Sequence, residues 1–124
     1  SQRAALAAVS AEPSVTFEMR EAFRRRRDLV LNGLNEIDGV VTNVPEGAFY
    51  LFPDISSFFG KSNGIYKIND ADDLTLYILN EALVALVSGN AFGAPKCVRI
   101  SYAASDEELI EAIKRIKTVL DKLS

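Results

Sequence analysis

The chain has 124 residues, a length that fits one domain. Its residues are 48% hydrophobic and 25% charged, which is ordinary for a globular protein and unlike a disordered chain. The net charge of −3 gives no electrostatic reason to expect binding to nucleic acid or to an anionic membrane surface.

The absence of certain residue types excludes several kinds of site. The chain has no histidine and one cysteine, Cys97, so Ser-His-Asp catalysis, Cys-His catalysis and an ordinary zinc site are excluded within it. A single cysteine cannot form an internal disulfide, and we therefore expect a reducing, cytoplasmic location. The apolar run at residues 82–87 is far too short to span a membrane, and residues 1–13 do not have the pattern of a signal peptide.

The first part of the chain is expected to be helical. Residues 1–9 predict a short helix that is broken near Pro13, and residues 14–38 predict one long amphipathic helix, which Gly39 ends. Apolar residues recur there at steps of three and four, as in Val15, Met19, Phe23, Val30, Leu34 and Ile37.

Strands and a further helix follow. Residues 39–44 and 48–53 are predicted strands around a turn at 45–47, and residues 56–69 are a predicted loop with one helical turn near its start. Asp70 is the expected N-cap of a helix over residues 71–83, because an aspartate there accepts hydrogen bonds from free backbone N–H groups.

The last third of the chain again has two predicted strands followed by a helix. Residues 84–88 and 98–103 predict strands, and Ser105 with Glu108 predicts a capping box at the start of the final helix. The order predicts an α/β fold (an α+β sandwich), with a small, mostly antiparallel or mixed sheet of about four strands covered by helices. Residues 39–124 are expected to form one compact unit.

Four consecutive arginines, Arg24 to Arg27, are the most conspicuous charged feature. On a helix their side chains point in four directions about 100° apart, so they cannot form one phosphate-binding stripe. Because the chain is also acidic, we expect a solvated or domain-interface role rather than nucleic-acid binding.

Arg99 is the best candidate for binding a ligand. Alternation along the predicted strand puts Val98 and Ile100 on the core face, and Arg99 on the other face with the small residues Cys97 and Ser101. A guanidinium on a rigid strand is suited to hold a carboxylate by two hydrogen bonds. From the residues alone, a structural salt bridge is the more common use of such an arginine, and both interpretations stay open.

Several motifs together resemble one known family, the class I/II pyridoxal-phosphate (PLP) aminotransferases of the prokaryotic aspartate aminotransferase type. The motifs occur in the expected order over nearly the whole chain. They are Ser1-Gln2-Arg3-Ala4-Ala5-Leu6-Ala7-Ala8, the helix segment Met19…Phe23…Arg26-Arg27-Asp28, Pro45-Glu46-Gly47-Ala48-Phe49-Tyr50, Gly89-Asn90-Ala91-Phe92-Gly93 and Val98-Arg99-Ile100-Ser101-Tyr102-Ala103.

The resemblance implies that the chain is a fragment of a longer protein, the C-terminal small domain of the PLP-dependent transferase fold. It also implies that residues 1–38 are helices that link residues 39–124 to the large domain. It implies that Arg99 binds the α-carboxylate of an amino-acid or 2-oxo-acid substrate in a double-displacement transamination. Phe49 matches an aromatic that lies near the substrate in relatives, although a strand core residue is an equally good interpretation.

The PLP-bearing lysine of the family occurs in an S-x-x-K context, which none of the six lysines here has. We therefore expect no catalytic and no cofactor-binding residue in this chain, and an inactive isolated fragment. The full-length protein is expected to be a homodimer that binds PLP in its large domain. Two alternatives stay open: another PLP enzyme of related fold, such as an aromatic or kynurenine aminotransferase or a C–S lyase, and a stand-alone, non-catalytic binding module.

Overall fold

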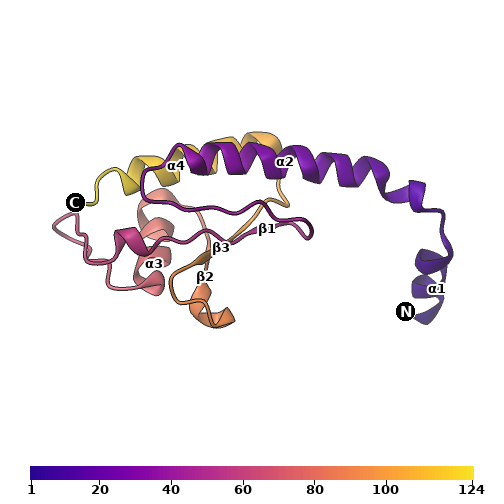
Figure 1. Cartoon of the computed structure of the whole chain (residues 1–124), viewed down its shortest axis with the longest axis horizontal. Coiled ribbons are helices and arrows are strands. Elements are labelled where there is room, and N and C mark those ends of the chain that lie inside the picture. The colour runs from indigo at the N-terminus through magenta and orange to yellow at the C-terminus, as the bar shows by residue number, and fades with distance from the viewer.

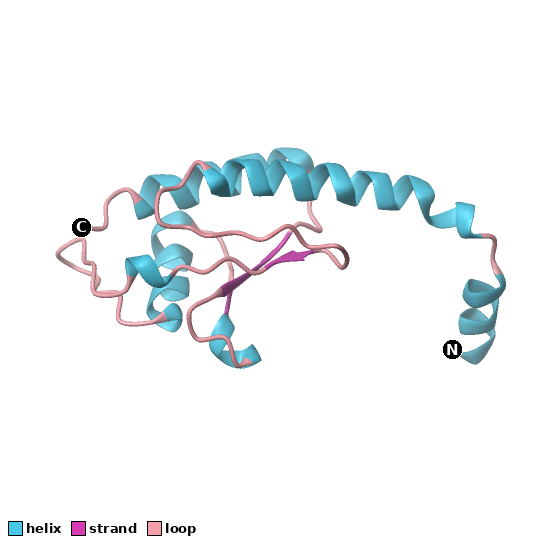
Figure 2. Cartoon of the chain, viewed as in Figure 1, coloured by secondary structure: helices cyan, strands magenta, loops and turns pink.

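A computed structural model describes residues 1–124, and it has the predicted α/β composition (Figures 1 and 2). The helices are α1 (Gln2–Ser10), α2 (Phe17–Asn35), α3 (Ala71–Ala82) and α4 (Asp106–Leu120). The strands are β1 (Tyr50–Leu51), β2 (Val87–Ser88) and β3 (Val98–Ser101), and three short 3₁₀ helices are η1 (Pro13–Thr16), η2 (Ser56–Phe58) and η3 (Gly89–Phe92).

The helices and the sheet form layers. α2 and α4 pack side by side on one face of the sheet, α3 packs against α4, and η3 lies beyond the end of β2, away from α2 and α4 (Figure 1). α1 stands apart at the far end of α2, and all of its residues are exposed. None of these helices combines the length and the apolar character that crossing a bilayer requires.

The two predicted N-caps are confirmed, whereas the predicted C-terminal glycine is wrong, because α2 ends at Asn35, four residues before Gly39. The Asp70 side chain accepts a hydrogen bond from the Asp73 backbone N–H at 2.9 Å, and Ser105 with Glu108 forms the complete capping box of α4. The long helix begins at Phe17 rather than at residue 14, because Pro13–Thr16 forms a 3₁₀ turn instead.

The sheet is antiparallel and three-stranded in the order β1-β3-β2, one strand fewer than expected. The missing strand is residues 39–44. Val41 and Asp54 exchange two backbone hydrogen bonds, at 3.0 and 2.9 Å, but this isolated bridge does not extend into a ladder. In this register the next hydrogen-bonded pair would be Asn43 and Phe52, and these two residues exchange no backbone hydrogen bond.

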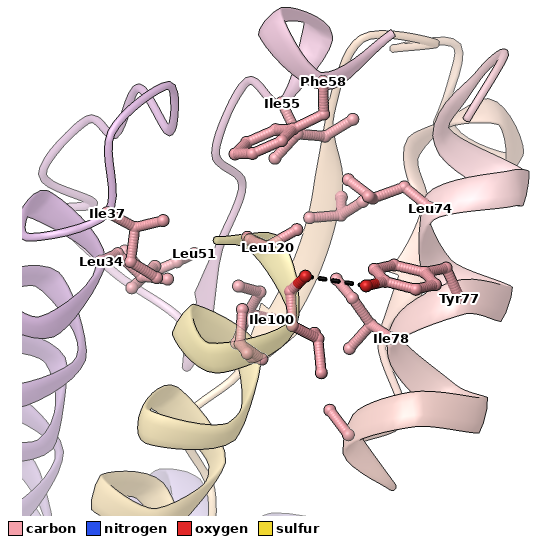
Figure 3. Close-up of a cluster of buried hydrophobic side chains, with 14 of the residues drawn as sticks. Leu34, Ile37, Leu51, Ile55, Phe58, Leu74, Tyr77, Ile78, Ile100 and Leu120 are labelled. Atoms are coloured by element: carbon pink, nitrogen blue, oxygen red, sulfur yellow. Dashed lines mark hydrogen bonds between the residues drawn. The ribbon is translucent and has the colours of Figure 1, made fainter. Parts of the chain in front are cut away.

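A continuous apolar core joins the layers. Its buried residues come from the second half of α2, from α3, from α4 and from one face of the sheet. Figure 3 shows Tyr77 of α3 reaching across this core, where its hydroxyl donates a 2.8 Å hydrogen bond to the Val119 carbonyl of α4. Every buried side-chain nitrogen or oxygen atom has a hydrogen-bond partner, so the core contains no unsatisfied polar side chain.

This cross-core hydrogen bond gives a stability prediction. Tyr77→Phe removes the donor, and we expect the free energy of unfolding in a urea titration to fall by about 1 kcal/mol, the net value of one such bond. Tyr66→Phe is the matched control, because the Tyr66 hydroxyl makes no hydrogen bond within the chain, and its stability should stay close to wild type. Equal stability of Tyr77→Phe and Tyr66→Phe would contradict the prediction.

Candidate functional site

Arg99 lies at the centre of the sheet, on the middle strand. Val98 and Ile100 are 2% and 8% exposed on the core face of β3, whereas Arg99 is half-buried on the other face. Pairing to β2 places Val87 opposite Arg99. The alternation predicted for this strand is therefore confirmed, and the strand is held on both sides.

The surroundings of the Arg99 guanidinium are aromatic rather than small. Its central carbon lies 4.6 Å from the ring centroid of Tyr50 and 4.7 Å from that of Phe92. Arg99 takes part in none of the ion pairs of the chain and in none of its side-chain hydrogen bonds. The structural salt bridge, one of the two interpretations from the sequence, is not formed.

This arrangement has a clear chemical capacity. A guanidinium interacts with aromatic rings through its π face and donates hydrogen bonds from the N–H groups in its plane. Its donors therefore stay available for a carboxylate, which can accept two of them side by side. The sequence prediction missed Tyr50 and Phe92. Tyr50 could have been found from its position in a predicted strand, because that strand pairs with the strand of Arg99. No local sequence pattern predicts that Phe92 lies beside Arg99.

Phe49, the second candidate, lies beside this group rather than in the core. It is 38% exposed, and its ring stacks at 5.9 Å on Phe23 of α2 and lies 4.4 Å from the Tyr50 ring. The Phe49 carbonyl accepts the backbone N–H of Tyr102 at 2.9 Å, which continues the pairing of β1 with β3. A buried core position is thus excluded, and a contact with substrate stays a prediction.

The four arginines on α2 are used inside the chain. Arg25 and Arg26 both donate to the carboxylate of Asp106, the first residue of α4, at 2.9 and 3.2 Å. Arg24 pairs with Glu21, and Arg27 pairs with Asp28 and donates to the Pro45 carbonyl. Hydrogen bonds from Arg25 and Arg26 hold the pKa of Asp106 below its usual range. The run therefore ties α2 to α4 and to the turn at 45–48.

The groove that Arg24 and Arg27 line is separate from Arg99. A groove of about 350 Å³ runs between α2 and the turn at 45–48, and it is lined by Phe23, Arg27 and Tyr102 among others. Arg99 does not line it. The groove and the Arg99 site are therefore two different surfaces.

The six lysines of the chain are all at least partly exposed. The Lys117 ammonium donates to the Glu36 carbonyl at 2.7 Å, and the Lys61 ammonium lies over the Phe58 ring at 5.2 Å. The other four lysines are exposed, and the enclosed cavity of about 90 Å³ is lined by apolar residues and Ser101. None of the six lysines lines this enclosed cavity.

Comparison with known proteins gives one consistent match. The sequence model of the family "Aminotransferase class I and II" matches residues 1–116. An aspartate aminotransferase of Streptomyces avermitilis is 47% identical over 95% of this chain and 29% of its own length. A bifunctional aspartate aminotransferase and glutamate/aspartate-prephenate aminotransferase of Petunia hybrida is 46% identical over 97% of this chain and 26% of its own.

The solved structures agree with the sequence match. The crystal structure of the aspartate aminotransferase from Rhizobium meliloti superposes with a TM-score of 0.92 at 45% identity, over 99% of this chain and 31% of that one. The chain therefore spans between 26% and 31% of the length of these three proteins.

The contact of Arg25 and Arg26 with Asp106 predicts a pH dependence. Because the pKa of Asp106 is lowered in the folded state, its stabilising contribution is present above the unfolded-state pKa of about 3.9 and is lost as the pH falls through the folded-state value. We expect Asp106→Asn to lower the free energy of unfolding at pH 7, and the difference from wild type to shrink at pH 3.

Glu107→Gln is the matched control, because Glu107 is exposed in the same helical turn and forms no ion pair. Urea titrations of wild type and both variants at the two pH values make the comparison. A difference between wild type and Asp106→Asn that is equally large at pH 7 and pH 3 would contradict the assignment.

Proposed function

Because the chain belongs to the class I and II aminotransferase family, we propose that it is the small domain of such an enzyme and holds the α-carboxylate of the substrate through Arg99. The observation that carries the proposal is the free guanidinium on β3. It is fixed on a rigid strand, it lies over two aromatic rings, and it has no carboxylate partner in the chain. The arrangement suits a carboxylate ligand that arrives from outside.

Arg99 would act by binding and orientation. Two parallel N–H···O hydrogen bonds fix both the position of a carboxylate and the plane in which it lies. Fixing the carboxylate leaves the substrate one main rotation, about the bond from the carboxylate to the α-carbon, so its α-proton and amino group are presented in a restricted geometry. Such orientation is a large part of what an enzyme contributes to a reaction between bound partners.

PLP, which the family implies, supplies the electron sink for moving an amino group. The lysines of this chain do not fit it, and we propose that the cofactor is bound by the rest of the polypeptide. The isolated chain is then inactive, because it holds one end of the substrate and none of the reacting groups.

We propose aspartate and 2-oxoglutarate as the substrates of the whole protein, because relatives that match over nearly the whole chain carry the name aspartate aminotransferase. A cytoplasmic homodimer is the proposed setting.

The first 38 residues fit a linking role. α1 has no buried residue, and α2 buries only Val30, Leu31 and Leu34, all in its second half. Apolar side chains stay exposed over the rest, including Leu6 at 68%, Val9 at 86% and Met19 at 64%. We propose that this apolar surface packs against the remainder of the polypeptide, since a row of exposed apolar side chains marks a contact surface.

The carboxylate role predicts the effect of removing the guanidinium. In the full-length protein, Arg99→Ala should lower kcat/KM for transamination by several orders of magnitude. Truncating one partner of a desolvated charge pair costs about 3–5 kcal/mol. Arg99→Lys should restore little, because an ammonium cannot supply two parallel hydrogen bonds.

Arg115→Ala serves as the matched control, since Arg115 is exposed on α4 and pairs only with Glu111. Steady-state kinetics with aspartate and 2-oxoglutarate make the measurement. A kcat/KM for Arg99→Ala within tenfold of wild type would show that the carboxylate is held elsewhere.

The absence of a fitting lysine predicts the outcome of chemical trapping. Incubating the isolated chain with PLP and reducing with borohydride should give only low labelling spread over exposed lysines, which peptide mass spectrometry can locate. The same treatment of the full-length protein should label one lysine outside this chain. Stoichiometric labelling of a single lysine within residues 1–124 would refute the proposed division of roles.

A further inference from the structure

The Arg99 side chain is positioned without any polar contact. Arginine has several rotatable bonds and loses much rotamer freedom when its head is fixed. In this chain the contacts available to fix it are the rings of Tyr50 and Phe92, at 4.6 and 4.7 Å from the guanidinium carbon. The orientation of Arg99 before substrate arrives therefore depends on these two rings.

Both rings are themselves held in place. Tyr50 lies in β1, paired with Ser101, and its ring contacts that of Phe49 at 4.4 Å. Phe92 meets the Phe52 ring edge to face, with centroids 5.9 Å apart and an interplanar angle of 84°. Two aromatic side chains held in this way are better supports than flexible ones, because they have little rotamer freedom of their own.

The turn that carries Phe92 is fixed from both ends. Gly89 is buried, and a Cβ at this position would overlap the carbonyl oxygens of Ala94 and Cys97, so η3 sits directly against the chain that leads into β3. The Asn90 side chain donates a 2.8 Å hydrogen bond to Asp72 of α3. η3 is thus anchored to both the sheet and α3, and Phe92 with it.

We propose that Tyr50 and Phe92 are positioning residues that pre-organise the Arg99 guanidinium for the substrate carboxylate, an inference that rests on the proposed function of Arg99. Ring faces suit this task better than an acidic side chain would. A carboxylate partner would occupy the same N–H donors that the substrate needs, whereas a ring leaves them free. The cation–π contacts hold the orientation and the substrate takes the hydrogen bonds.

The test uses the full-length protein and compares variants that remove a ring with variants that keep it. Phe92→Leu and Tyr50→Leu should each lower kcat/KM about tenfold, mostly through a higher KM for both substrates. A looser arginine weakens binding of ground state and transition state alike, and that raises KM more than it lowers kcat. Phe92→Tyr and Tyr50→Phe keep a ring face and should stay within about twofold of wild type.

A double-mutant cycle separates positioning from a general structural effect. In the Arg99→Ala background, Phe92→Leu and Tyr50→Leu should change the remaining kcat/KM less than twofold, because the group they position is gone. The same tenfold loss in both backgrounds would overturn the proposal, since the rings would then act independently of Arg99. If one leucine variant does not fold, the other still decides.

The two levels of the proposal fail differently. If Arg99→Ala keeps its activity, the carboxylate role itself is wrong. If Arg99→Ala is inactive while both leucine variants match wild type, Arg99 holds the carboxylate and only the positioning role of the rings is wrong.

Discussion

The alternation of side chains along β3 is the constraint on which the rest of the structure depends. β3 is the strand that pairs on both sides, with Leu51 opposite Ile100 and Val87 opposite Arg99. Val98 and Ile100 must face the core, because α2 and α4 cover that side with apolar residues. A slip of one residue would turn Arg99 into this core and expose both apolar side chains. The position of the guanidinium is therefore fixed by hydrophobic packing on the opposite face of its own strand.

Two of the four consecutive arginines on α2 connect that helix to α4. The second half of α2 belongs to the core, and its first half carries Arg25 and Arg26, which reach the first residue of α4. Asp106 also begins the helix that leaves β3 by a short connection. The first half of α2 is thus connected to the strand of Arg99. The connection runs from Arg25 and Arg26 through their ion pairs to Asp106, and from there through the short segment between α4 and β3.

The sequence predicted best what is specified locally. The caps at Asp70 and Ser105 were predicted correctly because the acceptor and the N–H that it satisfies lie within three residues of each other. The prediction of a fourth strand was wrong because residues 39–44 pair with their neighbour only at Val41 and Asp54, and the extent of such pairing is not visible in either segment alone. The face on which Arg99 lies followed from alternation alone. The two rings beside Arg99 could not be predicted in this way. Tyr50 lies about fifty residues away in the sequence and reaches Arg99 through strand pairing, and Phe92 lies seven residues away and reaches it through the geometry of a turn.

The different environments of the arginines explain why Arg99 can act on a ligand. With 17 acidic residues against 14 basic ones, the chain offers many carboxylates, and Arg25, Arg26 and Arg115 are each paired with one. Arg99 is kept from this pairing because the groups that surround it are rings. If a carboxylate binds there as proposed, the half-buried setting strengthens its interaction with the guanidinium. In the proposed role, the aromatic surroundings of Arg99 leave its N–H donors free for an external anion.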